Sequence, residues 1–190
     1  ELVRTIEKIM VDESYSDEFI ARYYELDNEI ADQKVYEITI AKCLNGFVKY
    51  FQTGDRDYLS FAYSYLETLK EITELNAEPS MWWIVRLLLL IADGFNQAAL
   101  WNAISPYFDI DSPIVKKYIY SLVYLEPKGI FELFITQRES LNKVLDKTEP
   151  GCIVTIPTSS GKTRIAEIAI LDSFINNPTK KILYIAPFRS

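Results

Sequence analysis

The sequence contains no histidine, two cysteines and six glycines among 190 residues. Without histidine, these residues hold no His-based catalytic triad, acid–base pair or metal site. Cys43 and Cys152 lie far apart in apolar surroundings, which is not the pattern of a disulfide framework and favours a reduced, cytoplasmic protein. A hydrophobic content of 49% excludes a disordered chain. The composition therefore predicts one or two folded domains whose chemistry rests on other residue types.

Long hydrophobic runs are also missing. The longest, residues 81–92, is interrupted by Arg86 and is too short to span a bilayer, so we expect no membrane partner. Because this run is apolar nearly all round, it predicts a central, buried helix. The chain starts at Glu1 with no basic-then-apolar leader, so no signal peptide is predicted, and a start without Met fits a sequence taken from within a longer protein.

Negative charge is concentrated at the front of the chain. The net charge of −7 divides into −9 for residues 1–80, −1 for residues 81–150 and +3 for residues 151–190. An acidic surface binds nucleic acid poorly, so the front part is expected to contact a protein partner or to act in autoinhibition. The alternative is that these acidic residues form only solvated helix faces. The basic end is compatible with phosphate-rich ligands.

Apolar residues recur every three or four positions up to residue 145, which is typical of successive helices packed as hairpins. Ser16 or Asp17 is expected to begin the second helix, and Gly54 to end the third. A helical solenoid is a weaker alternative, because no repeated signature is present. The expected helices cover residues 2–11, 17–24, 28–53, 58–72, 80–104 with a break at Gly94, 113–126 and 130–145.

Residues 151–164, GCIVTIPTSSGKTR, combine three local signals. Residues 152–156 are largely β-branched and predict a short buried strand, residues 157–163 form a loop ending in Gly-Lys-Thr, and a helical pattern follows. This is the context of a phosphate-binding P-loop, in which Lys162 reaches the β- and γ-phosphates of a nucleotide and Thr163 binds Mg²⁺. Ile156 stands where the strict motif has glycine. The alternative is an ordinary turn that enters a helix.

A second buried strand is expected at residues 181–186, after Asn-Asn-Pro ends the preceding helix. Two strands joined by a helix imply a parallel, right-handed βαβ crossover. The predicted fold class is therefore mainly α, with a helical N-terminal domain followed by the first βαβ unit of a P-loop α/β domain.

The helix with Gln137, the loop PTSSGKT and a strand ending in APFRS follow one another in this order. Over about residues 130–190 the chain thus resembles superfamily 2 DEAD/DEAH-box helicases, more closely their DExH branch. The resemblance implies a helical accessory domain at residues 1–127 and the truncated start of a RecA-like ATP-binding domain at residues 128–190. Helical extensions of this kind also resemble those of bacterial anti-phage defence helicases of the Hachiman type.

The resemblance also assigns roles to residues. Gln137 would recognise the adenine edge of ATP. Phe131 or Phe134 would either stack on the adenine or, as we favour, be buried in the interface between helix and sheet. Arg189 would contact a phosphate of bound DNA or RNA. The resemblance implies that Lys162 and Thr163 are also catalytic. The loop residues that it implies bind ATP and Mg²⁺ are Thr158, Ser159, Ser160, Gly161, Lys162 and Thr163.

The favoured function is the N-terminal part of an ATP-dependent nucleic-acid helicase or translocase. In helicases of this class an Asp-Glu pair holds Mg²⁺ and activates water. No such pair follows the loop within these 190 residues, and no second RecA-like domain does, so we expect hydrolysis to need further sequence. The alternative is a helical protein-interaction module fused to a non-helicase P-loop ATPase, of the AAA+ or signalling class. A third interpretation is a helical scaffold with a degenerate P-loop.

Overall fold

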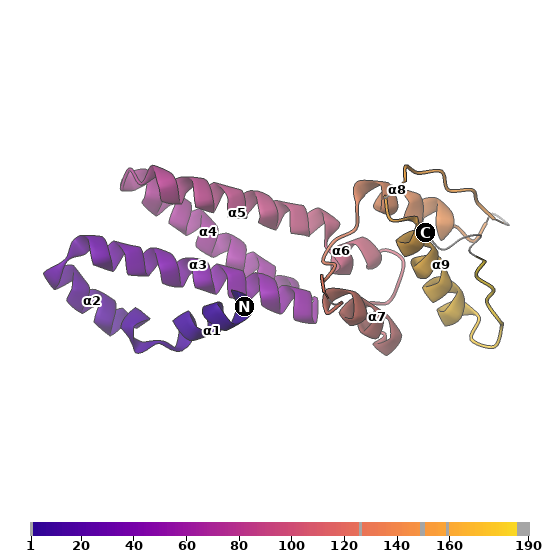
Figure 1. Ribbon diagram of the computed structural model, residues 1–190, viewed down its shortest axis with the longest axis horizontal. Coiled ribbons are helices and arrows are strands. Elements are labelled where there is room, and N and C mark those ends of the chain that lie inside the picture. The colour runs from indigo at the N-terminus through magenta and orange to yellow at the C-terminus, as the bar shows by residue number, and fades with distance from the viewer. Residues whose placement is uncertain (1, 126, 149–150, 159, 186–190) are drawn as a thin grey trace. The chain divides into compact units, whose positions relative to one another are not determined.

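The computed structural model describes residues 2–125, 127–148, 151–158 and 160–185 (Figure 1). The regular secondary structure of these residues is helical, which confirms the mainly α prediction. The chain divides into two compact units, Glu1–Asn96 and Gln97–Ser190. The functional boundary expected between residues 127 and 128 is a different division of the chain and stays a prediction.

α3 (Asn28–Thr53) is the central helix of the first unit, as Figure 1 shows. It packs against α1 (Leu2–Val11), α2 (Asp17–Leu26) and α4 (Arg56–Leu75), and a 3-10 turn, η1 (Glu13–Tyr15), joins α1 to α2. Its buried side recurs with the helical period that the sequence predicted. The buried residues of α3 are Ala31, Tyr36, Ile38, Ala41, Cys43, Gly46, Phe47, Tyr50 and Phe51.

Polar caps fix the ends of these helices. The Ser16 hydroxyl accepts a hydrogen bond from the Phe19 N–H at 3.4 Å, as expected for an N-cap. Gly54, which is left-handed with φ 76°, donates its N–H to the Tyr50 carbonyl oxygen at 2.8 Å and ends α3. Both caps expected from the sequence are therefore confirmed.

α3 and α4 approach each other closely at Gly46. A Cβ atom placed on Gly46 would lie 2.9 Å from the Tyr58 carbonyl oxygen and 3.0 Å from the Cβ of Ala62. The absence of a side chain at this position is therefore what allows the two helices to pack at their present separation.

α5 (Pro79–Ala98) runs through Gly94 without the break that the sequence analysis expected. A glycine inside a helix costs only about 1 kcal/mol, which packing on both sides of it offsets. Phe95, the next residue, packs edge-to-face against Phe47 and Phe51 of α3, with ring centroids 5.5 and 4.7 Å apart. These contacts hold α5 on the first unit beyond the glycine.

The prediction that α5 is buried all round is wrong. Its Val85, Leu89 and Ala92 are buried, whereas Trp83, Leu87 and Leu90 are 68%, 59% and 68% exposed. The reason is that the other helices of the first unit cover α5 from one side (Figure 1). None of the described helices, α5 included, has both the length and the hydropathy needed to cross a membrane.

The second unit begins at Gln97, in the last turn of α5, and continues with α6 (Leu100–Ile104) and α7 (Pro113–Val123). The chain before α6 pairs with residues 131–133 through an isolated antiparallel bridge. In this bridge the Leu100 N–H donates to the Phe131 carbonyl oxygen at 3.0 Å, and the Leu133 N–H donates to the Ala98 carbonyl oxygen at 2.9 Å. The pairing keeps residues 131–133 extended, which is why the helix expected from residue 130 starts later.

α8 (Ile135–Val144) and α9 (Lys162–Asn176) pack against each other and complete the described part of the second unit. α9 starts two residues earlier than the helical pattern indicated, directly at Lys162. The buried hydrophobic residues of these two helices are Leu141, Ile165, Ile168 and Leu171.

The two predicted strands are not formed in the described residues. Residues 151–157 and 181–185 are irregular, so the expected βαβ unit is not shown. Ile153 is 95% exposed, where the sequence analysis expected a buried strand. The predicted strands lack partner strands to form backbone hydrogen bonds with. A sheet needs three or more strands to be stable by itself, and the sequence predicts two. Residue 186 lies outside the described residues.

Candidate nucleotide-binding loop

The loop of residues 157–163 leads into the first turn of α9. Gly161 caps the helix in the left-handed conformation, with φ 74° and ψ 41°. Its carbonyl oxygen accepts a hydrogen bond from the Arg164 N–H at 3.0 Å. The side chains of Lys162 and Thr163 follow on the exposed surface of the first turn. A helix N-terminus with unpaired N–H donors and a neighbouring ammonium group is a suitable place for an anion.

Gln137 on α8 is buried, with 5% of its surface exposed, and its amide group joins two segments. Its Oε1 accepts a hydrogen bond from the Phe134 N–H at 2.9 Å and caps α8. Its Nε2 donates to the Gly161 carbonyl oxygen at 3.1 Å. Gln137 therefore contacts the loop expected to bind phosphate, while its predicted contact with adenine stays a prediction.

The contact between Gln137 and the loop depends on glycine. A Cβ atom on residue 161 would lie 2.1 Å from the Gln137 Nε2, and the left-handed φ disfavours any other residue. Both residues were expected at the site from the sequence, but their hydrogen bond was not. Its only local signal was the position of Gln137 three residues after Phe134, which is the spacing of a reciprocal helix cap.

The remaining loop residues are less constrained. The Ser160 N–H donates to the Pro157 carbonyl oxygen at 3.4 Å, Ser160 is half-buried and Thr158 is exposed. Ser159 lies outside the described residues, so its predicted contact with phosphate stays a prediction. The same holds for Arg189 and the Pro-Phe-Arg segment around it.

A charged pair on α9 lies next to the loop. The Arg164 guanidinium pairs with the Glu167 carboxylate one turn along the helix. Burial, the largest cause, raises the pKa of Tyr118 on α7 to about 12, while nearby Arg164 lowers it and Glu167 raises it. This cluster was not predicted from the sequence, although the spacing of Arg164 and Glu167 is that of a helical ion pair.

The two phenylalanines before α8 are exposed. Phe131 and Phe134 are 41% and 55% exposed, so the favoured prediction that they are buried in an interface between helix and sheet is wrong. Phe131 lies in the bridge that precedes the helix, and Phe134 caps the helix with its backbone, which leaves its ring at the surface.

A cleft of about 470 Å³ lies between α8 and the segment that leads into the loop. It is the space beside residues that were expected to form the first strand. Its lining residues are Thr136, Glu139, Ser140, Lys143, Ile153, Val154, Thr155, Ile156 and Pro157.

Comparison with known proteins shows similarity to helicases in the second unit and to one relative over most of the chain. Residues 135–190 match the sequence model of the DEAD/DEAH box helicase family. The chain is 36% identical over 166 residues, 87% of its length, to the Hachiman protein HamB of Bacillus cereus. It is 39% identical over 66 residues, 35% of its length, to the ATP-dependent DNA helicase Hel308 of Pyrococcus horikoshii. The chain spans 15% of the length of HamB and 9% of that of Hel308.

Proposed function

We infer that this chain, which is related over residues 135–190 to the DEAD/DEAH box helicases, provides the nucleotide-binding start of an ATP-dependent nucleic-acid helicase or translocase. The observation that carries the inference is the left-handed Gly161 at the start of α9, held by Gln137 and followed by Lys162 and Thr163. The family match over the same residues supports it.

ATP with Mg²⁺ is the ligand that these residues fit. The backbone N–H groups of residues 158–161 and of the first turn of α9 would bind phosphate oxygens, and the Lys162 ammonium would neutralise their charge. The Thr163 hydroxyl would bind Mg²⁺. The hydrogen bond from Gln137 to the Gly161 carbonyl oxygen supports this fit, because it holds the loop backbone at the start of α9. Bound ATP would supply the free energy for movement along nucleic acid.

Gln137 is proposed to recognise adenine while it holds the loop. A carboxamide has two N–H donors and two acceptor lone pairs, and the structure uses one of each, at Gly161 and Phe134. The remaining donor and lone pair suit the N7 and N6 groups of adenine. The exposed ring of Phe134, whose backbone N–H donates to this amide, is a candidate to stack on the base.

Residues 152–156 and 181–186 are proposed to become parallel strands when further strands of a RecA-like domain flank them. The exposed aliphatic residues of both segments and the cleft beside the first one support this. Arg189, after the second segment, is proposed to contact a phosphate of DNA or RNA. The accessory domain would comprise residues 1–127 and the RecA-like start residues 128–190.

Similarity to HamB over most of the chain supports a role in anti-phage defence. The net charge of −9 on residues 1–80 favours a protein over nucleic acid as the partner of the helical part. Nucleic acid is proposed to bind to the RecA-like part.

The test has two steps. Binding of a fluorescent ATP analogue with Mg²⁺ to the chain should weaken at least about tenfold in Lys162→Ala and on chelation of Mg²⁺. The control is Lys147→Ala, which removes an exposed lysine of the same unit that pairs with Asp172 at 3.8 Å. In the full-length polypeptide that contains this sequence, DNA- or RNA-stimulated ATPase should fall about 100-fold or more in Lys162→Ala. Unchanged binding and ATPase in Lys162→Ala would refute the proposal.

A further inference from the structure

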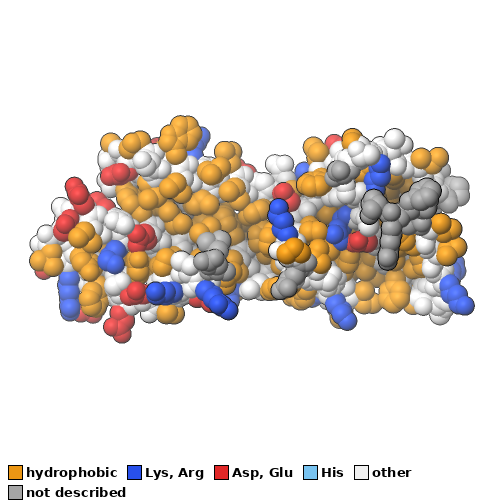
Figure 2. Space-filling model, viewed as in Figure 1, with side chains coloured by type: hydrophobic (Ala, Val, Ile, Leu, Met, Phe, Trp, Pro, Cys, Tyr) orange, Lys and Arg blue, Asp and Glu red, His pale blue; other side chains and the backbone are white. Residues whose placement is uncertain are grey.

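α5 presents an apolar stripe on the side opposite its buried residues. Trp83, Leu87 and Leu90 are exposed and lie in line with Gly94 along the helix. Because an α-helix turns by 3.6 residues, this line is on the far side from the buried Val85. In Figure 2 hydrophobic side chains are visible along α5.

The spacing of the stripe is that of a helix that packs against another helix. Steps of four, three and four residues separate Trp83, Leu87, Leu90 and Gly94, which is the pattern of the a and d positions of a coiled coil. A contiguous exposed patch of this kind on a globular domain marks an interaction surface. The described first unit covers only the other side of α5.

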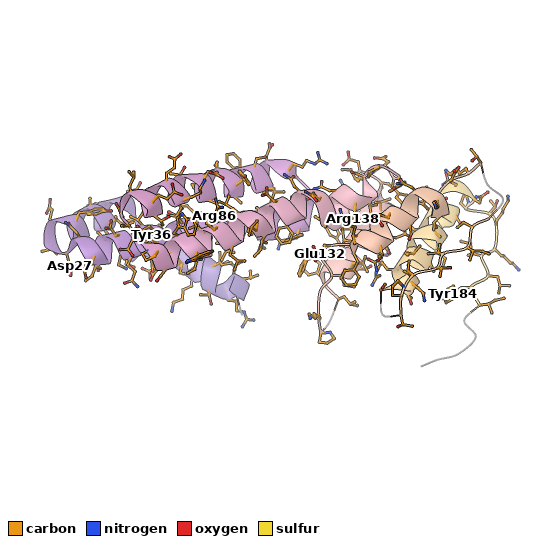
Figure 3. All side chains as sticks on the ribbon, turned by 90° about the horizontal axis from the view of Figure 1, so that it is seen from above. Asp27, Tyr36, Arg86, Glu132, Arg138 and Tyr184 are labelled. Atoms are coloured by element: carbon orange, nitrogen blue, oxygen red, sulfur yellow. The ribbon has the colours of Figure 1, made fainter. Side chains whose placement is uncertain are left out.

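The two edges of the stripe differ in chemistry. Arg86 and Asp93 are the only charged residues of α5, both are exposed, and they lie one heptad apart along the same edge. Arg86, labelled in Figure 3, also lies over the Trp82 ring, 5.3 Å from its centroid. Ile84 and Ile91 follow the other edge and are 45% and 37% exposed. The stripe thus has one charged edge, with one residue of each sign, and one apolar edge.

We propose that this stripe binds α5 of a second copy of the chain, with the two helices antiparallel around a two-fold axis between Leu87 and Leu90. Such a symmetric contact is formed by the same surface on both copies. It sets Leu87 against Leu90 of the second copy, and Trp83 against Gly94. A Cβ atom on Gly94 would meet nothing within 4 Å, so the helix surface is open where the large indole would lie.

Charge complementarity selects the same arrangement. In an antiparallel pair the g positions of the two helices face each other, so Arg86 of each copy lies opposite Asp93 of the other and two ion pairs form. In a parallel pair the charged edge of one helix would face the apolar edge of the other, and Trp83 would meet its own copy. Only the antiparallel pair brings charged edge to charged edge and apolar edge to apolar edge. It also places the large Trp83 side chain against Gly94.

The contact is smaller than a standard interface, which buries roughly 800 Å² per partner. We therefore expect a weak dimer, with a dissociation constant on the order of 10 µM. The proposal is independent of the nucleotide-binding loop, because its residues all lie in the first unit.

The test is sedimentation velocity of the 190-residue chain from about 1 to about 300 µM, a range that brackets the expected dissociation constant. Arg86→Asp and Asp93→Arg each place like charges opposite each other twice and should weaken the dimer about tenfold. The double variant R86D/D93R, and an equimolar mixture of the two single variants, should recover the wild-type affinity. This recovery separates a direct contact from a loss of folding.

A second variant tests the shape of the contact. Gly94→Leu fills the space expected for Trp83 of the second copy and should abolish the dimer, while its better helix propensity keeps the monomer folded. Leu75→Ala, at an exposed residue at the end of α4, is the control and should leave the dimer unchanged. The proposal is overturned if the chain stays monomeric over the whole concentration range. In that case another segment or protein must cover the stripe. Association that the charge exchange and Gly94→Leu leave unchanged also overturns the proposal.

Discussion

The Nε2 atom of Gln137 lies 2.1 Å from the point where a Cβ atom on Gly161 would stand, and it donates a hydrogen bond to the Gly161 carbonyl oxygen at 3.1 Å. One residue is on α8 and the other directly precedes α9, so the start of α9 is fixed by a contact with a neighbouring helix. The identity of residue 161 is therefore set by backbone conformation and by this contact together.

Gly161→Ala should lower the free energy of unfolding by about 1–3 kcal/mol, because alanine at φ 74° is strained and its methyl group meets Gln137. The double variant G161A/Q137A removes the steric contact but not the strain, so its loss should be smaller than the sum of the two single losses. Urea unfolding followed by circular dichroism measures all three. Strictly additive losses would show that the two side chains do not meet.

The amide of Gln137 caps α8 through one atom and holds the loop through the other. Gln137→Ala leaves the Phe134 N–H without its acceptor and should speed hydrogen exchange at this amide, with a loss of about 1–2 kcal/mol. Gln137→Glu keeps the acceptor for Phe134 but loses the donor to Gly161, so exchange at Phe134 should stay slow while the loop loosens. Amide exchange by NMR distinguishes the two. Gln33→Ala, at an exposed residue that donates to Glu37, is the control.

Gly46 and Gly94 form a matched pair for helix packing. Both lie inside helices, so replacement by alanine gains the same helix propensity of about 1 kcal/mol. At Gly46 the new methyl group meets the Tyr58 carbonyl oxygen and Ala62, so Gly46→Ala should be destabilising by about 1–3 kcal/mol. At Gly94 it meets nothing within 4 Å, so Gly94→Ala should be stabilising. Thermal unfolding at a few micromolar, below the proposed self-association, checks both signs.

The two thiols should differ sharply in reactivity. Cys152 is exposed, whereas Cys43 is buried on α3 and burial raises the pKa of its thiol to about 12. A thiol reagent should therefore modify one cysteine in the folded chain and both in denaturant. The variant Cys152→Ser should show no rapid reaction, and rapid modification of it would contradict the burial of Cys43.

The same thiol predicts a pH dependence. Cys43 has an ordinary pKa of 9.0 and a folded value of about 12, so above pH 9 the unfolded chain loses this proton before the folded chain does. The free energy of unfolding should therefore fall as the pH rises from about 9 to about 12. The fall should be smaller in Cys43→Ala, measured by urea unfolding at several pH values.

Helices were predictable from the sequence because their signals are local. The period of apolar residues located α3, and the Ser16 and Gly54 caps located helix ends to within a residue or two. Lys162 and Thr163 were correctly expected near the start of a helix for the same reason. The exposed stripe of α5 was missed, because an apolar sequence does not say how many neighbours a helix has.

Features that depend on distant parts of the chain were missed. The late start of α8 follows from the pairing of residues near Glu132 with those near Ala99. The hydrogen bond of Arg138, labelled in Figure 3, to the Gln97 carbonyl oxygen at 3.0 Å is also invisible to a local pattern. The prediction of strands at residues 152–156 and 181–186 was wrong for the described residues. A strand needs neighbouring strands, and the sequence of one segment does not specify them.

The segment of residues 182–185 has a consequence for handling the protein. Its four large apolar side chains are exposed, and the segment has the composition of an aggregation-prone β-strand. Lys180 and Lys181 stand directly before it, and we expect them to oppose aggregation because their like charges repel a second molecule that approaches in register. Replacing both lysines by neutral residues should therefore increase aggregation of the chain.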